Sequence, residues 1–501
     1  MLGKFFKDFA AYLPSKLLPA LTGFITAPIL TRLLTTTEFG NYALAIGSYE
    51  FLFAMTCSGL GAGAVRFYLK YQTQNRLGTF YSMLGASAGL VVTLAAALSA
   101  LLLRQFRGHL PADLYPLLLL SVLIFTVQAT FSVFMQVLRA QERSKLYTRL
   151  ELLANYGGLG LGLGLLYLFS WGVAGLLWGT FIAVALALLI LLPRILRSND
   201  GRVPMQRASS SDMGRLWQYA WPLALGNMAM WGLRLSDRYL IGVMRSRAEV
   251  GLYSAAYNIS SKSIDILVSV FLLSLGPMVI NIWERSGLEQ TQQSLTATTR
   301  VFLILCLPAT AGLAVLAQPF IQLLTAASYH EGYRIVGYVV FSSFIYGLAQ
   351  IASVGLLIAK RTNQIAINQI VAVLITTGLN IWLIPRYGFV AAGMTTLIGY
   401  GTLLLLQAVS ARPNLPWAFP FHTLRNVVLA TGAMSVTAVV IYNLPGNDGR
   451  LHIGFLLLSV ISAMLVYGLS LILLGELKKS EVTAVKQAVH NVAQRRRATS
   501  L

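Results

Sequence analysis

The chain has 501 residues, of which 56% are hydrophobic and only 11% are charged. Soluble domains carry about 25% charged residues, so this composition excludes a water-soluble globular protein. In a soluble chain the net charge of +21 would indicate nucleic-acid binding, but in a membrane protein an excess of Lys and Arg in cytoplasmic loops explains it better. We therefore expect a polytopic membrane protein with no nucleic-acid partner.

About fourteen apolar runs follow one another along the chain, each near the roughly 20 residues that a helix needs to cross a bilayer. Strands of a membrane barrel would instead alternate in polarity over about ten residues. We therefore predict an all-α fold with about 14 transmembrane helices. The expected spans lie near residues 12–34, 40–65, 79–103, 115–138, 151–169, 172–193, 217–243, 251–280, 298–318, 335–359, 364–384, 389–410, 425–443 and 452–475.

Short motifs of the first six spans recur in the next six. The pattern Glu-x-Gly-x-Tyr occurs at residues 38–42 and again at residues 249–253. Repeated halves within a hydrophobic chain are typical of transporters that move around a central cavity. Because each half has six spans, both halves insert in the same orientation. We predict two six-helix repeats around a central cavity, followed by two additional helices.

The expected domain layout follows from this repeat. It consists of an N-terminal six-helix bundle at 1–193, a linker at 194–215, a C-terminal bundle at 216–411, two additional helices at 412–475 and a basic tail at 476–501. Lys and Arg crowd the segments that share a side with the N-terminus, the linker and the tail. The positive-inside rule therefore places both termini and the linker in the cytoplasm.

Residues suited to metal or covalent chemistry are sparse. The chain has only two cysteines, Cys57 and Cys306, and five scattered histidines. Neither set forms a disulfide framework, a metal-ligand cluster or a catalytic spacing. We therefore expect no metal, no cofactor and no enzymatic activity.

Charged residues inside the expected spans are the candidates for function, because burying a charge in a membrane is costly. Arg234, Asp237 and Arg238 lie at i, i+3 and i+4 of the seventh span and share one helix face. Lys262 and Asp265 lie at i and i+3 of the eighth span, and Glu50 lies at a similar depth in the matching span of the first half.

Two interpretations of these charges remain open. In the first, the carboxylates only neutralise neighbouring cations, and the pairs are structural. In the second, the cations bind an anionic substrate, while the acidic residues orient them or carry a coupling proton. Three cations against two anions leave a surplus positive charge in the second half, and the positions that match residues 234, 237 and 238 in the first half are uncharged. This surplus favours the second interpretation.

Two stretches resemble the signatures of bacterial polysaccharide flippases. The first comprises residues 28–34 and 38–42, and the second comprises residues 237–239 and 249–257. The chain is similar in layout to this family over nearly its whole length. The family belongs to a superfamily that also contains multidrug and toxin extruders and the lipid II flippase. The resemblance implies two six-helix bundles around a central cavity, plus two extra helices.

The resemblance also implies a function in the bacterial inner membrane. A flippase of this kind would move an undecaprenyl-pyrophosphate-linked oligosaccharide from the cytoplasmic to the periplasmic leaflet, for surface or exopolysaccharide synthesis. Its partners would be that substrate, membrane lipids, and a polysaccharide polymerase with its chain-length machinery. Arg234, Arg238 and Lys262 would bind the anionic cargo. The supporting or coupling residues would be Asp237, Asp265 and Glu50.

Two other functions remain open. A cation-coupled multidrug exporter of the same fold would expose acidic or aromatic surface in its cavity, and the surplus cations disfavour it. A membrane-embedded polysaccharide polymerase or ligase would carry a large outer loop with catalytic residues. The expected outer connections are short, which disfavours that enzyme.

Overall fold

The computed structural model describes residues 24–195, 197–198, 201–202, 206–444 and 453–476. In this part of the chain the regular elements are helices, apart from a small hairpin of two-residue strands. In it β1 (Arg197–Ser198) pairs antiparallel with β2 (Gly201–Arg202). Nine described helices are long and apolar enough to cross a membrane, or ten when the bent pair α2 and α3 counts as one span. The predicted all-α polytopic fold is therefore confirmed. Residues 12–23 of the first expected span, the loop 445–452 and the tail from 477 lie outside the described residues.

The described chain forms two compact units. The N-terminal unit contains residues 24–258 and Thr362–Gly399, and the C-terminal unit contains Ile259–Arg361 and residues 400–476. Helices of the expected second half are thus divided between the units. The domain boundaries drawn from the sequence repeat stay a prediction.

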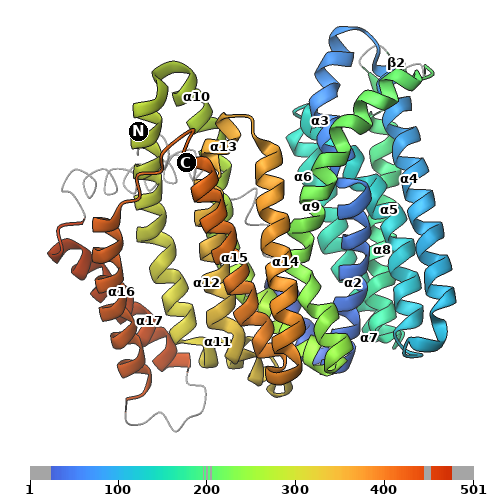
Figure 1. The fold of residues 1–501 in the computed structure, drawn as a ribbon. Coiled ribbons are helices and arrows are strands. Elements are labelled where there is room, and N and C mark those ends of the chain that lie inside the picture. The colour runs from blue at the N-terminus through green and yellow to red at the C-terminus, as the bar shows by residue number, and fades with distance from the viewer. Residues whose placement is uncertain (1–23, 196, 199–200, 203–205, 445–452, 477–501) are drawn as a thin grey trace, which may run out of the picture. The chain divides into compact units, whose positions relative to one another are not determined.

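The N-terminal unit is a helical bundle (Figure 1). After the apolar helix Phe24–Leu33, its elements are α2 (Thr36–Thr56), α3 (Ser58–Thr73), α4 (Leu77–Gln105), η1 (Arg107–His109), α5 (Tyr115–Ala140), α6 (Ser144–Leu152), η2 (Leu153–Gly157), α7 (Gly158–Leu168), α8 (Gly172–Ile195), α9 (Ser210–Met244) and α14 (Thr362–Tyr387). It also contains the first turns of α10 (Arg247–Val315) and of α15 (Phe389–Ala411). One expected span is bent by 47° where α2 meets α3.

The core of this unit lies between α3, α4, α5, α8 and the start of α9. Phe80, Phe125 and Leu216 are fully buried there. Asp212 fixes the end of the linker beside this core. It accepts a hydrogen bond from Tyr71 at 2.8 Å and forms an ion pair with Arg76 at 3.2 Å. The hydrogen bond from Tyr71 contributes most to holding the pKa of the Asp212 carboxyl below its ordinary value.

The repeated Glu-x-Gly-x-Tyr motifs meet where α2 crosses α10. A Cβ atom on Gly40 would lie 2.0 Å from the carbonyl oxygen of Arg247, and one on Gly251 would lie 1.8 Å from that of Thr36. Only a glycine allows backbones to approach this closely. The recurrence of the motif in both halves therefore has a structural reason. Gly40 of α2 lies against the backbone of α10, and Gly251 of α10 lies against the backbone at the start of α2.

A polar cluster surrounds this crossing. Arg247 forms an ion pair with Asp113 at 2.5 Å and donates a hydrogen bond to Asn41 at 3.2 Å. Burial alone would raise the pKa of the Asp113 carboxyl, but hydrogen bonds from Arg247 and Asn41 hold it below its ordinary value. The start of α10 is thus fastened to both α2 and the loop before α5.

The C-terminal unit is built around the rest of α10. Its further elements are α11 (Ala317–Leu324), η3 (Ala327–Gly332), α12 (Tyr333–Ala352), α13 (Val354–Ile358), the rest of α15, α16 (Phe421–Tyr442) and α17 (Ile453–Leu473). Two expected spans, near 251–280 and 298–318, both belong to α10. They are joined at Gly287, whose φ of 73° is accessible to glycine at little cost.

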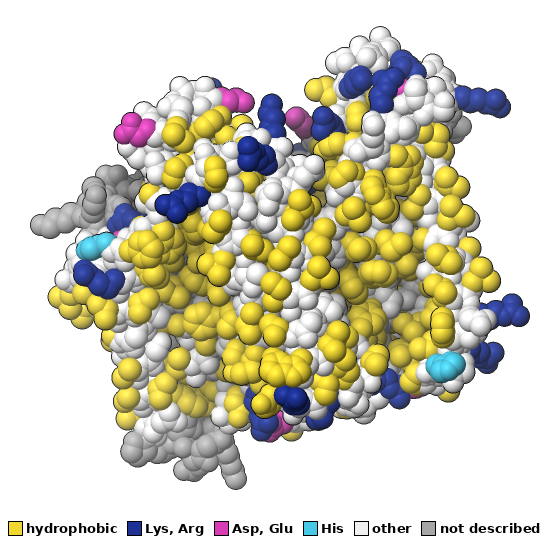
Figure 2. All heavy atoms as spheres, in the orientation of Figure 1, with side chains coloured by type: hydrophobic (Ala, Val, Ile, Leu, Met, Phe, Trp, Pro, Cys, Tyr) yellow, Lys and Arg dark blue, Asp and Glu magenta, His cyan; other side chains and the backbone are white. Residues whose placement is uncertain are grey.

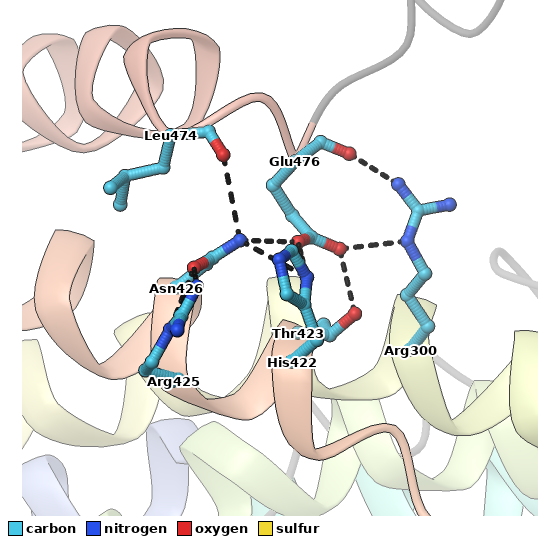
Figure 3. Close-up of polar contacts among 7 residues, drawn as sticks. All are labelled: Arg300, His422, Thr423, Arg425, Asn426, Leu474 and Glu476. Atoms are coloured by element: carbon cyan, nitrogen blue, oxygen red, sulfur yellow. Dashed lines mark hydrogen bonds and ion pairs between the residues drawn. The ribbon is translucent and has the colours of Figure 1, made fainter.

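The additional helices α16 and α17 lie side by side and are fastened to α10 by Glu476 (Figures 1 and 3). This carboxylate is 4% exposed and contacts Arg300 at 2.8 Å, Thr423 at 2.7 Å and Asn426 at 3.0 Å. Burial raises the pKa of Glu476, but the hydrogen bonds from Arg300, Thr423 and Asn426 lower it more. Glu476, the third residue after α17, therefore links α17 to α10 and α16.

The surfaces of both units suit a lipid environment. Hydrophobic side chains cover the middle of the helices, and Lys and Arg side chains gather toward the helix ends (Figure 2). On α4, for example, Leu94, Leu98 and Leu101 share one face and are 60%, 57% and 64% exposed. A row of exposed leucines along a 29-residue helix is expected only where lipid covers it.

Candidate functional site

One face of α9 carries polar side chains through an apolar bundle. Asn227, Arg234 and Arg238 are spaced i, i+7 and i+11, so they share this face. Asn227 and Arg234 are exposed, whereas Arg238 is buried. On the same face Trp231 donates a hydrogen bond to the carbonyl of Gly47 at 3.3 Å, which places this stretch of α9 against α2. The polar face thus runs from an exposed position into the packed interior of the N-terminal unit.

Arg238 is a buried cation without a paired carboxylate. It is 4% exposed, and no described carboxylate forms an ion pair with its side chain. Its Nη2 donates to Oδ1 of Asn258 at 3.1 Å, and its guanidinium lies 5.4 Å from the centre of the Tyr257 ring. Within the part of the chain that the structure describes, its Nε has no acceptor. A buried arginine in this state is expensive unless an anion reaches it.

Asp237 is the neighbouring carboxylate, and its hydrogen-bond partners lie elsewhere. It is 2% exposed and accepts hydrogen bonds from the hydroxyl of Tyr253 and, at 3.4 Å, from that of Thr396. It also accepts the backbone N–H of Arg238 at 2.9 Å, but not the guanidinium. Asp237 therefore forms no ion pair with the Arg238 side chain, and the interpretation in which it neutralises Arg234 or Arg238 stays a prediction.

The other candidate residues differ in burial and in the unit to which they belong. Arg234 is exposed one helical turn before Arg238, and Glu50 is half-buried on α2. Lys262 and Asp265 are half-buried on α10 and belong to the C-terminal unit. Of the six predicted site residues, the N-terminal unit therefore contains Arg234, Asp237, Arg238 and Glu50.

Sequence reasoning missed the neutral residues that hold the charged ones. Tyr253, Tyr257 and Asn258 lie close together on α10, and Thr396 comes from α15. Tyr253 and Tyr257 lie in the stretch 249–257 that resembles the family signature, but the sequence does not indicate which charged side chains they contact. Among the described residues, no group of three or more His, Cys, Asp or Glu side chains lies close enough to hold a metal ion.

Comparison with known proteins gives a family and a fold. The family model described as "Polysaccharide biosynthesis protein" matches residues 5–283, more than half of the chain. No curated protein matches the chain.

Three solved structures share the fold. The lipid II flippase MurJ, in an inward closed conformation, has a TM-score of 0.73 at 14% identity, over 93% of this chain and 98% of that chain. An inward-facing multidrug resistance MATE family transporter has a TM-score of 0.68 at 11% identity, over 80% and 97%. The Vibrio cholerae MATE transporter VcmN, as a mutant, has a TM-score of 0.56 at 17% identity, over 82% and 99%. At these identities the likeness shows a MATE-like polytopic fold.

Proposed function

The chain belongs to the polysaccharide biosynthesis protein family, and from this premise we propose that it is a flippase for a lipid-linked oligosaccharide. The proposed cargo is an undecaprenyl-pyrophosphate-linked repeat unit in the bacterial inner membrane. It moves from the cytoplasmic to the periplasmic leaflet by alternating access and serves surface or exopolysaccharide synthesis. The MATE-like fold and the family match support a transporter rather than an enzyme.

The observation that carries the proposal is the unpaired charge of Arg238. A cation buried in an apolar bundle is stabilised when an anion provides the missing partner. Guanidinium groups bind phosphate oxygens through directed, charge-assisted hydrogen bonds, and the Nε–H of Arg238 has no acceptor in the described chain. A pyrophosphate suits this cation, whereas a cationic drug would be repelled by it.

The polar face of α9 gives the cargo an order of contacts. Exposed Arg234 and Asn227 meet the anion first, and Arg238 binds it when the helices around α9 separate. Lys262 is the third proposed cation. Asp237, Asp265 and Glu50 support these cations or carry a coupling proton. A polysaccharide polymerase and its chain-length machinery receive the transported unit in this proposal.

The decisive experiment deletes the gene and follows the lipid-linked intermediate. Loss of a surface or secreted polysaccharide, with its repeat unit trapped in the inner leaflet, is the expected result. Wild-type protein should restore export, and Arg238→Gln should not, although it inserts normally. Arg107→Gln provides a matched control, because Arg107 is an exposed arginine outside the polar face of α9.

The rival functions predict different outcomes. A drug exporter would leave the polysaccharide intact and raise drug sensitivity on deletion. A polymerase or ligase would leave the repeat unit in the outer leaflet, unpolymerised or unattached. A strain that lacks every other flippase is needed for the deletion, so that an intact polysaccharide counts against the proposal.

A further inference from the structure

Among the residues that the structure describes, Asn258 is the one side chain that holds the guanidinium of Arg238 by a hydrogen bond. It lies in an Asn-Ile-Ser triplet, which matches a glycosylation motif but is part of α10, where Asn258 is half-buried. Its Oδ1 accepts from Nη2 of Arg238 at 3.1 Å. An amide oxygen accepts a hydrogen bond as a carboxylate does but carries no net charge. Asn258 therefore fixes the guanidinium and leaves its positive charge intact.

Tyr257 contributes a second neutral contact from the adjacent position of α10. Its ring faces the guanidinium at 5.4 Å and attracts it through the ring quadrupole, again without a formal charge. The Tyr257 ring in turn packs against Tyr253, with centroids 5.6 Å apart. Two directions of the guanidinium are thus occupied by neutral groups on one helix.

The neighbouring carboxylate, Asp237, forms no ion pair with this guanidinium. Tyr253 and Thr396 donate hydrogen bonds to Oδ2 of Asp237, and Oδ1 accepts the backbone N–H of Arg238. A site built only for stability would place a carboxylate against a buried arginine, because an uncompensated buried charge destabilises a fold. Here the two side chains that contact the guanidinium, Asn258 and Tyr257, are neutral and leave its charge in place.

We propose that Asn258 is a positioning residue that makes the site selective for anions. It orients Arg238 without neutralising it, so that the Nε–H edge stays available to a phosphate oxygen of the cargo. This inference rests on the proposed function, because it concerns the same site and names pyrophosphate as the group that is recognised.

The test replaces the neutral amide of Asn258 with a negatively charged carboxylate of nearly the same shape. Asn258→Asp supplies an acceptor of the same size that forms an ion pair with Arg238. Undecaprenyl pyrophosphate is the probe, undecaprenol is its uncharged counterpart, and binding is measured on the purified full-length protein by native mass spectrometry. We expect Asn258→Asp to weaken binding of the pyrophosphate lipid by about tenfold or more, with a Tm equal to or above that of the wild type.

Three further variants separate positioning from simple packing. Asn258→Ala removes the hydrogen bond but not the charge, so it should weaken binding less than Asn258→Asp does. Asn155→Asp adds the same charge at an exposed position of the N-terminal unit and should leave binding unchanged. In an Arg238→Gln background, Asn258→Asp should have no further effect on binding, because the charge that it neutralises is already gone.

The outcomes are distinguishable. If the wild type binds both lipids equally, the proposed substrate class fails, and the inference fails with it. If the wild type prefers the pyrophosphate lipid and Asn258→Asp keeps that preference, the proposed function survives and Asn258 is only a packing residue.

Discussion

Lys262 and Asp265 are the charged residues for which a substitution best separates structural pairing from substrate binding. The two residues are one helical turn apart on α10, and both are half-buried. A structural pair would tolerate the removal of both charges, since replacing a buried pair by apolar residues is often neutral. A binding residue would not, because the cargo would lose a cation.

The double substitution Lys262→Leu with Asp265→Leu separates these interpretations. We expect it to abolish polysaccharide export while the protein still reaches the membrane, as measured by immunoblot of the membrane fraction. The matched control removes the exposed pair Glu331 and Arg334, which lie 2.8 Å apart at the same i, i+3 spacing. Replacing both by Gln should leave export normal, because exposed pairs contribute only about 0 to 1 kcal/mol. Normal export by the Leu double variant would remove Lys262 from the binding set.

At the scale of helices, the crossing of α2 and α10 is the feature that the repeated motif explains. Gly251→Ala would place a methyl group 1.8 Å from the Thr36 carbonyl oxygen, so the two helices must separate. We expect the free energy of unfolding to fall by about 1 to 3 kcal/mol, as is usual for overpacked positions. The measurement is thermal or denaturant unfolding of the purified protein.

Gly378→Ala provides the control for that substitution. Gly378 lies within α14, is exposed, and has no atom within 4 Å of an added Cβ. The same change there should be neutral or stabilising by up to about 1 kcal/mol, because alanine favours the helix. Equal stability of the two variants would mean that the crossing is not as tight as this structure has it.

Hydrophobicity and spacing are local properties, which is why the helices and the repeat could be predicted from the sequence. The run of charges in α9 was visible for the same reason. The partners of those charges were not, since Tyr253 and Thr396 reach Asp237 from 16 and 159 positions away. The break at Gly287 agrees with the two spans expected near 251–280 and 298–318, because the polar residues around it indicate a connection between helices.

For the molecule as a whole, the distribution of basic residues predicts its orientation in the membrane. Lys and Arg gather at helix ends (Figure 2), and the positive-inside rule assigns the richer side to the cytoplasm. Lipid-linked glycans are proposed to enter from that side and to leave on the other. The orientation is thus a premise of the proposed function and needs its own test.

Two exposed glycines offer matched positions for this test. Gly108 precedes α5 in a segment expected outside. Gly214 lies in the first turns of α9, near the end of the linker 194–215, and is expected inside. Neither has an atom within 4 Å of an added Cβ, so cysteine fits at both. Cys57 and Cys306 are both fully buried, and each is replaced by Ala to give a background free of thiols.

An impermeant thiol reagent applied to intact spheroplasts should label Gly108→Cys and leave Gly214→Cys unlabelled. The expected result follows from the charge asymmetry alone, because moving the basic linker across the membrane would place its arginines on the disfavoured side. Permeabilised cells serve as the control, since both cysteines must react once the reagent has access to both faces. Labelling of Gly214→Cys in intact spheroplasts would invert the topology, and the cargo would then have to enter from the opposite leaflet.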